Sequence, residues 1–177
     1  DISSSANADP PVVVGYLPPT IASVVAPPRL STAGGERVTL SGSQLSADAS
    51  SLVVTYGPYT ATECEMLVAH ANVTCLTASG GGVNHTWNVR VGEQSSDGAG
   101  DPTASFAAPR VLAAAAAELD LGLATGGAPV VLNGTNFGVD TQVWVGKREC
   151  KNVQATWGEV RCFMPEGSGV VDVTAVV

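Results

Sequence analysis

The sequence predicts an all-β fold made of two repeated units, and three observations lead to that prediction. The stretch GGERVTLSGSQL at residues 34–45 recurs, with substitutions, as GGAPVVLNGTNF at residues 126–137. Aromatic residues make up only 5% of the chain, so its cores have to be built mainly from Val, Leu and Ala, and Val favours strands. Several segments alternate between apolar and polar residues with the period of a half-buried strand. Self-similarity at a fixed offset indicates repeated building blocks.

Residues 1–17 are expected to be a linker or the tail of a preceding repeat. The first ten residues, DISSSANADP, are polar and offer few anchors for a core. VVVGYLPPTI then predicts a short strand, an aromatic residue and a proline-rich exit. A similar pattern, an aromatic residue followed by proline and an aliphatic residue, recurs in TASFAAPRV at residues 103–111. The first complete unit is therefore expected to begin near Pro18.

Unit one is expected over residues 18–108 and unit two over residues 109–177. In unit one the alternation predicts strands at residues 21–25, 37–42, 51–57, 71–77, 84–92 and 103–108. In unit two it predicts strands at residues 129–134, 141–146, 159–164 and 170–177. Unit two has no aromatic-x-x-Pro segment like the one that closes unit one, so it is expected to lack its last strand, with more protein following.

The segment VLAAAAAELDLGL at residues 111–123 conflicts with this scheme. Its five consecutive alanines favour a helix by intrinsic propensity. However, it lies between the proline exit and the Gly-Gly turn, where unit one has IASVVAPPRLST and where a first strand is needed to cover the sheet. We expect an extended strand, with the helix as the alternative.

Charge and hydropathy exclude two classes of partner. The formal net charge is −8, and the eight Lys and Arg residues are spread singly, so no basic stripe is available for a phosphate backbone or an anionic membrane surface. No apolar run approaches the roughly 20 residues that span a bilayer. The chain starts at DISSS, without Met or a signal-like apolar core, and reads as a fragment of a longer mature protein. Neither nucleic-acid binding nor direct membrane insertion is expected.

The four cysteines form two pairs, Cys64 with Cys75 and Cys150 with Cys162, and each pair is expected at the same place in its repeat. Their spacing suits two neighbouring strands joined by a turn, whereas a zinc site usually has short Cys-x-x-Cys spacings. We predict one disulfide within each unit, with paired free thiols as the alternative. Such bonds persist outside the reducing cytosol.

Three Asn-x-Ser/Thr sequons predict N-glycan acceptors at Asn72, Asn84 and Asn133. In VVLNGT the alternation places Val130 and Leu132 on one face of a strand and Asn133 on the other. NVTC places Asn72 outward in the same way. Both of these asparagines are therefore expected to face solvent, and Asn84 is the less certain acceptor.

The residues after position 17 resemble the IPT/TIG family, the immunoglobulin-like domains of plexins, some other surface receptors and certain transcription factors. The resemblance lies in the Pro-aliphatic start, the run GG-x-x-V-x-L-x-G-x-x-L/F, the two cysteines and a late V-x-V strand, all present in both units. It implies tandem immunoglobulin-like β-sandwiches. The cysteine placement resembles that of extracellular members. Unit one departs from the pattern because it is longer between SGSQL and Cys64 and lacks the usual Asn-Phe after its glycine.

The repeated run also has a direct physical interpretation. Each Gly-Gly pair suits a turn with positive φ. The strand that follows should point Val38 and Leu40 inward in unit one, and Val130 and Leu132 inward in unit two. The glycine at the end of each run, Gly42 or Gly134, is expected to end the strand.

The sequence predicts neither catalysis nor a bound metal or cofactor. Its two histidines, His70 and His85, have no counterparts in unit two, and the chain contains no Gly-x-Ser-x-Gly elbow and no phosphate-binding Gly-x-x-x-x-Gly-Lys motif. Asp97 and Asp101, with Glu93 nearby, could supply oxygen ligands to calcium, but their spacing fits no EF-hand loop. A solvated loop rich in Gly, Ser and Asp is the preferred interpretation.

Three classes of function remain. The leading hypothesis is a non-catalytic structural and interaction module of a large secreted or cell-surface glycoprotein, acting as spacer and assembly unit. Its partners would be other protein chains or neighbouring repeats of the same protein. One alternative is a receptor ectodomain that binds a protein ligand. The other is an accessory carbohydrate-binding domain of an enzyme, for which Trp87, Trp144 and Trp157 could stack on sugars if they do not simply cover a core.

Overall fold

Unit one is a sandwich of two antiparallel sheets. The computed structural model describes residues 15–98, 100–116 and 126–177. One sheet has the strand order β1-β2-β6-β5, and the other has the order β4-β3-β7-β8 with β9 also paired to β7. A short 3-10 turn, Ala49–Ser51, precedes β3. The strands are β1 Thr20–Val25, β2 Arg37–Ser43, β3 Leu52–Tyr56, β4 Tyr59–Thr60, β5 Thr62–Val68, β6 Asn72–Leu76, β7 His85–Val91, β8 Gln94–Ser95 and β9 Thr103–Ala104.

Unit two repeats this architecture with fewer strands. One sheet has the order β10-β11-β15-β14, matching β1-β2-β6-β5, and the other has the order β13-β12-β16. The strands are β10 Arg110–Ala116, β11 Pro129–Thr135, β12 Gln142–Val145, β13 Arg148–Glu149, β14 Lys151–Ala155, β15 Glu159–Phe163 and β16 Val173–Val176. The all-β sandwich prediction is confirmed for both units.

Each unit has a separate apolar core between its sheets, and the repeated run supplies residues to both. Val38, Leu40 and Leu132 have 0% exposure and Val130 has 8%, so the predicted inward face is correct. The Gly-Gly pairs have φ values of 73° and 77° in unit one and of 74° and 89° in unit two, as predicted. Alternation along one strand was sufficient to identify these core positions.

The glycine near the end of each run allows two backbones to approach closely. A Cβ atom on Gly42 would overlap the carbonyl oxygen of Thr20, and one on Gly134 would overlap that of Arg110. The register of the first strand shifts next to this crossing in both units. The strands run one residue beyond the glycines, so the expectation that Gly42 and Gly134 end them is wrong.

The alanine-rich segment is extended where the structure describes it. β10 pairs with β11 from Arg110 to Ala116, so the helix alternative is wrong for these residues. Pairing with β11 supplies hydrogen bonds that outweigh the helix propensity of alanine. Residues 117–123 of the predicted strand lie outside the described residues.

Five strands were missed in the sequence. Three of them, β4, β8 and β13, have only two residues, and the two longer ones, β5 and β14, are each the last strand of their sheet. Most β5 side chains are exposed, and the register of each strand with its neighbour shifts. A strand with little buried surface and an irregular register has no clean period of two, which is why alternation did not reveal it.

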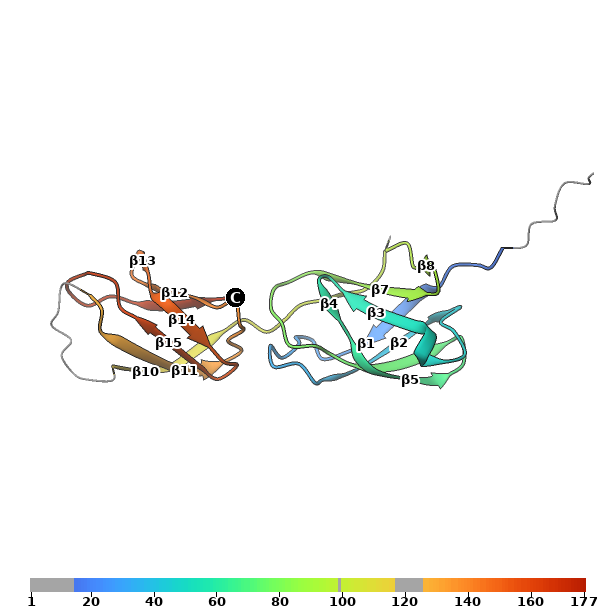
Figure 1. Cartoon of the computed structure of the whole chain (residues 1–177), viewed down its shortest axis with the longest axis horizontal. Coiled ribbons are helices and arrows are strands. Elements are labelled where there is room, and N and C mark those ends of the chain that lie inside the picture. Colours follow the sequence, from blue (N-terminus) through green and yellow to red (C-terminus); the bar gives the residue numbers. More distant parts are fainter. Residues whose placement is uncertain (1–14, 99, 117–125) are drawn as a thin grey trace, which may run out of the picture.

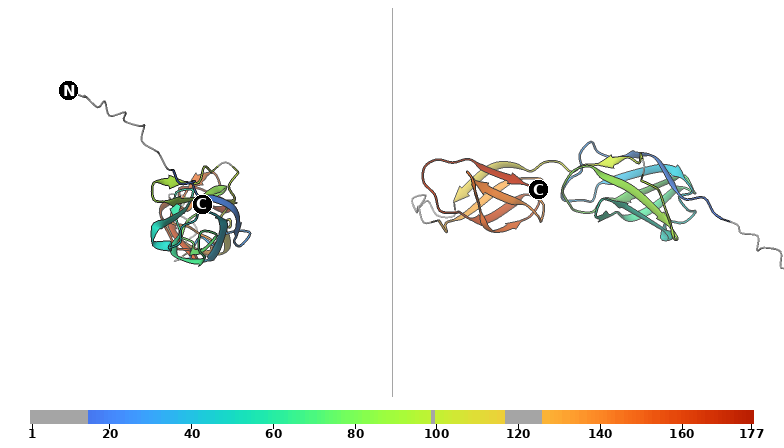
Figure 2. Two further views of the ribbon diagram at one scale, coloured as in Figure 1. Left: turned by 90° about the vertical axis from the view of Figure 1, so that its right-hand side faces the viewer. Right: turned by 90° about the horizontal axis from the view of Figure 1, so that it is seen from above.

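The two units lie end to end along the long axis of the molecule. Figures 1 and 2 show unit two and unit one as successive bodies joined by a short connection, with the last residue at the junction between them. The connection is short because Ala107 still donates its amide hydrogen to Leu30 of unit one, and β10 begins at Arg110.

Candidate functional site

The junction between the units contains a buried hydrogen bond. Thr32, which is 3% exposed, donates its hydroxyl hydrogen to the carbonyl oxygen of Phe137 at 3.0 Å. Beside it, a Cβ atom on Gly81 would overlap the side chain of Val177, and one on Gly138 would lie 3.0 Å from the same side chain. The missing side chain of Gly81 therefore lets Val177 of unit two approach unit one closely, and Gly138 leaves room for the same side chain within unit two.

The face that unit one presents at the junction is a glycine-rich loop held by aromatic side chains. The hydroxyl of Tyr59 donates to the carbonyl oxygen of Gly81 at 2.9 Å and accepts from its amide at 3.0 Å. His85 makes a further hydrogen bond from Nε2 to the same carbonyl, at 2.8 Å. Tyr56 exchanges two hydrogen bonds with Ala78, and burial raises the pKa of Tyr56 to about 12, which keeps its hydroxyl a donor. These contacts order a loop that its glycines alone would leave mobile.

The face that unit two presents is also preorganised. Thr141, which is 4% exposed, accepts from the amide of Gly138 at 2.8 Å and donates to its carbonyl at 2.6 Å. The adjacent Phe137 is fully buried in the core of unit two and donates its amide hydrogen to the carbonyl of Trp157 at 3.1 Å. The carbonyl that receives the Thr32 hydroxyl is therefore fixed by unit two before the units meet.

A groove of about 560 Å³ lies on unit one. Its wall is formed by the end of β1 with the prolines that follow, and by residues next to β7 and β9. Pro27, Pro28, Pro102, Val83 and Asn84 are among its lining residues. The predicted glycan acceptor Asn84 therefore lies at a concave surface.

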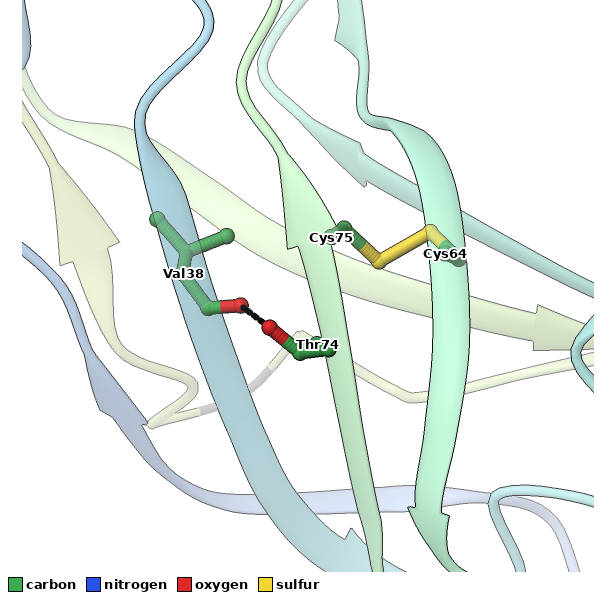
Figure 3. The surroundings of a disulfide bond; sticks show 4 residues. All are labelled: Val38, Cys64, Thr74 and Cys75. Carbon is green, nitrogen blue, oxygen red and sulfur yellow. Dashed lines mark hydrogen bonds between the residues drawn. A yellow bond between two sulfur atoms is a disulfide. The ribbon is translucent and has the colours of Figure 1, made fainter.

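The two disulfides join Cys64 to Cys75 and Cys150 to Cys162, with sulfur–sulfur distances of 2.07 Å and 2.11 Å. Cys75 lies opposite Val38 on the central strand β6 of unit one (Figure 3). Cys162 occupies the equivalent inward position in unit two, opposite Val130 on the central strand β15. Their partners are not equivalent, as described next.

The first cysteine of each pair occupies a different place in its unit. Cys150 donates its amide hydrogen to the carbonyl oxygen of Val143. In unit one the matching hydrogen bond runs from the amide of Ala61 to the carbonyl oxygen of Val54. Cys64 lies three residues further along, within β5. The expectation that each pair sits at the same place in its repeat is therefore wrong. The similar spacing of the two pairs concealed this difference. The bond Cys64–Cys75 joins the adjacent strands β5 and β6, whereas Cys150 lies where the chain crosses from β13 in one sheet to β14 in the other.

The three sequon asparagines differ in exposure. Asn84 and Asn133 are exposed, whereas Asn72 is only partly exposed because β6 lies between β2 and β5. The third residue of the Asn72 sequon, Thr74, is 3% exposed and donates its hydroxyl hydrogen to the carbonyl of Val38 at 3.1 Å (Figure 3). Asn84, ranked below Asn72 on the sequence, is the more accessible side chain in the folded chain.

The other candidate groups do not converge. Within the described ranges, no three side chains from His, Cys, Asp or Glu are gathered as a metal ion would need, and Asp97, Asp101 and Glu93 do not form such a group. His70 lies in the turn before β6, and His85 lies after the loop that follows β6. In the part of the chain that the structure describes, no helix is long and apolar enough to cross a membrane.

The three tryptophans form no common platform. Trp87 is 1% exposed and packs against Tyr56 in the core of unit one, with ring centroids 4.4 Å apart. Trp144 is half-buried on β12 of unit two, and Trp157 is 61% exposed in the turn between β14 and β15. The proposed sugar-stacking surface is therefore not assembled.

Several solved structures resemble the chain. The surface glycan-binding protein PbSGBP-B from Prevotella bryantii matches with a TM-score of 0.52 and 14% identity, over 92% of this chain and 40% of that one. The extracellular region of plexin A4 matches with a TM-score of 0.42 and 18% identity, over 90% of this chain and 17% of that one. SGBP-B from a xyloglucan utilization locus in Bacteroides uniformis matches with a TM-score of 0.37 and 13% identity, over 89% of this chain and 45% of that one. The chain spans less than half of each of these proteins.

The sequence comparison identifies the family. No curated protein sequence matches the chain. The family model of the IPT/TIG domain matches residues 19–105 and 121–177, which cover most of both sandwiches. The chain therefore belongs to the IPT/TIG family of immunoglobulin-like interaction domains.

Proposed function

We propose that the chain is a non-catalytic spacer and assembly segment of a large secreted or cell-surface glycoprotein, with residues 18–108 and 109–177 as successive domains. The observation that carries this proposal is the buried hydrogen bond from Thr32 to Phe137 between units whose cores are separate. A buried carbonyl or hydroxyl loses free energy when its partner moves away, so this bond favours one relative orientation. Two bodies held end to end in one orientation maintain a fixed spacing along the chain.

The disulfides support a location outside the cytosol, and the sheet edges support protein partners. Two intact disulfides suit an oxidising compartment outside the cytosol. The outer strands β5 and β14 each end a sheet, and such an edge can accept a strand from another chain or from a neighbouring repeat. We propose protein chains as the partners for this reason.

Small-angle scattering on the intact chain tests the spacer. A compact body of 177 residues would have a radius of gyration of about 16 Å. We expect a clearly larger value and a distance distribution with the shoulder typical of two bodies in line. A radius close to the compact value would contradict the proposal.

The Thr32→Val variant tests the bond that orients the units. It keeps the side-chain shape but leaves the carbonyl of Phe137 without its donor, at a cost of about 1 kcal/mol to the junction. We expect residual dipolar couplings of the two units to report different alignment in the variant and a common alignment in the wild type. Thr20→Val is the matched control, because its hydroxyl bonds to Ser43 on the surface of unit one. Equal effects of the two substitutions would exclude a special role for Thr32.

We also propose that the sequons carry N-glycans when the chain passes through a eukaryotic secretory pathway. Exposure in the folded state favours Asn84 and Asn133 over Asn72. Intact-mass analysis before and after enzymatic removal of N-glycans should show a loss of mass. Peptide mapping should place the glycans at Asn84 and Asn133. The Asn84→Gln and Asn133→Gln variants should each lose one glycan. An unchanged mass in wild-type protein would refute this proposal.

A further inference from the structure

The two disulfides differ in their access to solvent. Cys64 is partly exposed, whereas Cys75, Cys150 and Cys162 are buried, with 0%, 3% and 3% exposure. Cys64 lies on β5, the last strand in the order β1-β2-β6-β5, and Figure 3 shows it beside Cys75 on β6. Although Cys64 packs partly against the core of unit one, it is the most exposed of the four cysteines, and it lies on an edge strand where an incoming thiol can approach. Burial protects both sulfurs of Cys150–Cys162 from such an approach.

β5 is held weakly to the rest of unit one. Its register with β6 shifts at two places, which interrupts the ladder of hydrogen bonds. Glu63, at the first shift, has a φ of 48°, a conformation that non-glycine residues rarely adopt. At the other end of the strand Leu67 and Val68 are 57% and 51% exposed. The apolar surface that β5 buries is therefore mainly that of Cys64 and Met66, which pack partly buried against the core of unit one. Segments with these properties open locally without global unfolding.

Cys150–Cys162 is held by the core of unit two. Cys162 lies opposite Val130 on the central strand β15, and Cys150 donates its amide hydrogen to Val143 of the facing sheet at 2.8 Å. Both cysteines belong to the buried core cluster of this unit. Exposing either sulfur disrupts this core, whereas lifting β5 moves a strand whose side chains are mostly exposed, so opening at Cys150–Cys162 costs more free energy.

We propose that Cys64–Cys75 is a thiol–disulfide exchange site that a dithiol reductant opens while Cys150–Cys162 stays closed. One thiolate of the reductant attacks the sulfur of Cys64, and the sulfur–sulfur bond breaks with its electron pair on Cys75. The sulfur of Cys75 takes a proton from water as β5 lifts. The mixed disulfide joins the first sulfur of the reductant to the sulfur of Cys64. The second thiolate of the reductant then attacks the first sulfur of the reductant and releases Cys64 as a thiolate, which is protonated. The protein gains two thiols, and the reductant becomes a disulfide.

The charges next to Cys64 select among reductants. Glu63 and Glu65 flank it in the chain and are both exposed. Their carboxylates repel a thiolate that carries additional negative charge and attract one that carries an ammonium group. The site therefore suits a neutral or cationic thiol better than an anionic one.

Reduction would also change the surface of unit one. Without the bond to Cys75, β5 remains attached to β6 only through its interrupted ladder. Lifting β5 uncovers the backbone groups of β6, and an unpaired strand edge accepts a strand from a partner. The exchange site thus controls an edge that the oxidised protein keeps covered.

Differential alkylation of the folded, full chain tests the proposal. The protein is exposed to dithiothreitol for timed intervals, quenched with one alkylating label, unfolded, fully reduced and treated with a second isotopic label. Peptide masses then give the reduced fraction of each cysteine. We expect Cys64 and Cys75 to acquire the first label at least about tenfold faster than the pair in unit two, which serves as an internal control. Equal rates, or faster labelling of Cys150 and Cys162, would overturn the proposal.

Two further measurements separate local opening from unfolding. After reduction, hydrogen exchange should accelerate in β5 and β6 but not in β3 or β7, and acceleration throughout unit one would refute an exchange site that opens locally. Cysteamine should reduce Cys64–Cys75 faster than 2-mercaptoethanesulfonate does, with a difference that shrinks in high salt. A preference for the anionic thiol would contradict the part assigned to the two glutamates.

Discussion

Replacing Trp87 with Ala is expected to destabilise unit one by about 3–5 kcal/mol, the usual cost of removing a buried indole. Trp87 is 1% exposed, lies opposite Tyr56 in the β3–β7 pairing and stacks on its ring at 4.4 Å. The cavity would lie between the two sheets, where strands on both sides limit its collapse. Urea unfolding followed by hydrogen exchange, read separately for peptides of each unit, measures the effect.

Trp157→Ala is the matched control for this substitution. Trp157 is 61% exposed, so its replacement should change stability by less than about 0.5 kcal/mol. Because the cores are separate, Trp87→Ala should leave exchange in β11 and β15 nearly unchanged. A loss of stability shared equally by both units would show that they fold as one cooperative body, against the modular interpretation.

Removing the disulfide of unit two by the double substitution Cys150→Ala and Cys162→Ala is expected to cost about 3 kcal/mol. The estimate follows from the chain entropy restored to the unfolded state when a loop of 12 residues is opened. Within the described residues, the core cluster of unit two has 8 buried members against 15 in unit one, so unit two has less apolar burial to offset the loss. We expect its thermal transition to fall far below that of unit one.

The double substitution Cys64→Ala and Cys75→Ala provides the comparison. It opens a loop of 11 residues, so the chain-entropy cost is nearly the same, but it acts on the unit with the larger core. Unit one should remain folded at 37 °C and lose protection mainly in β5. If unit one of this variant unfolded at a lower temperature than unit two of the Cys150→Ala, Cys162→Ala variant, unit two would not be the unit that depends more on its disulfide.

The candidate site was only partly accessible from the sequence. Sequons and cysteines are local signals, so Asn84, Asn133 and all four cysteines were identified by residue type and spacing. The junction was missed because Thr32 and Phe137 carry no motif and are brought together only by the packing of two units. Tyr59 was missed in the same way, and His85 was set aside as a histidine without a counterpart in unit two. Their shared partner Gly81 lies in a loop whose role becomes visible only beside Val177.

The sequence by itself determined the repeat, the inward faces of β2 and β11 and the positive φ of the Gly-Gly turns, because period, alternation and the absence of a Cβ atom act within a few residues. The position of the alanine run in the repeat already favoured a strand, and the tertiary structure excluded the helix alternative for residues 110–116. Only the tertiary structure decided that Cys64 and Cys150 are not equivalent and that β5 is an edge strand. The physical reason is that these outcomes depend on partners distant in sequence. Extended alanines are stabilised by β11, a cysteine is placed by the strand that receives its amide hydrogen, and an edge is defined by the neighbour that a strand lacks.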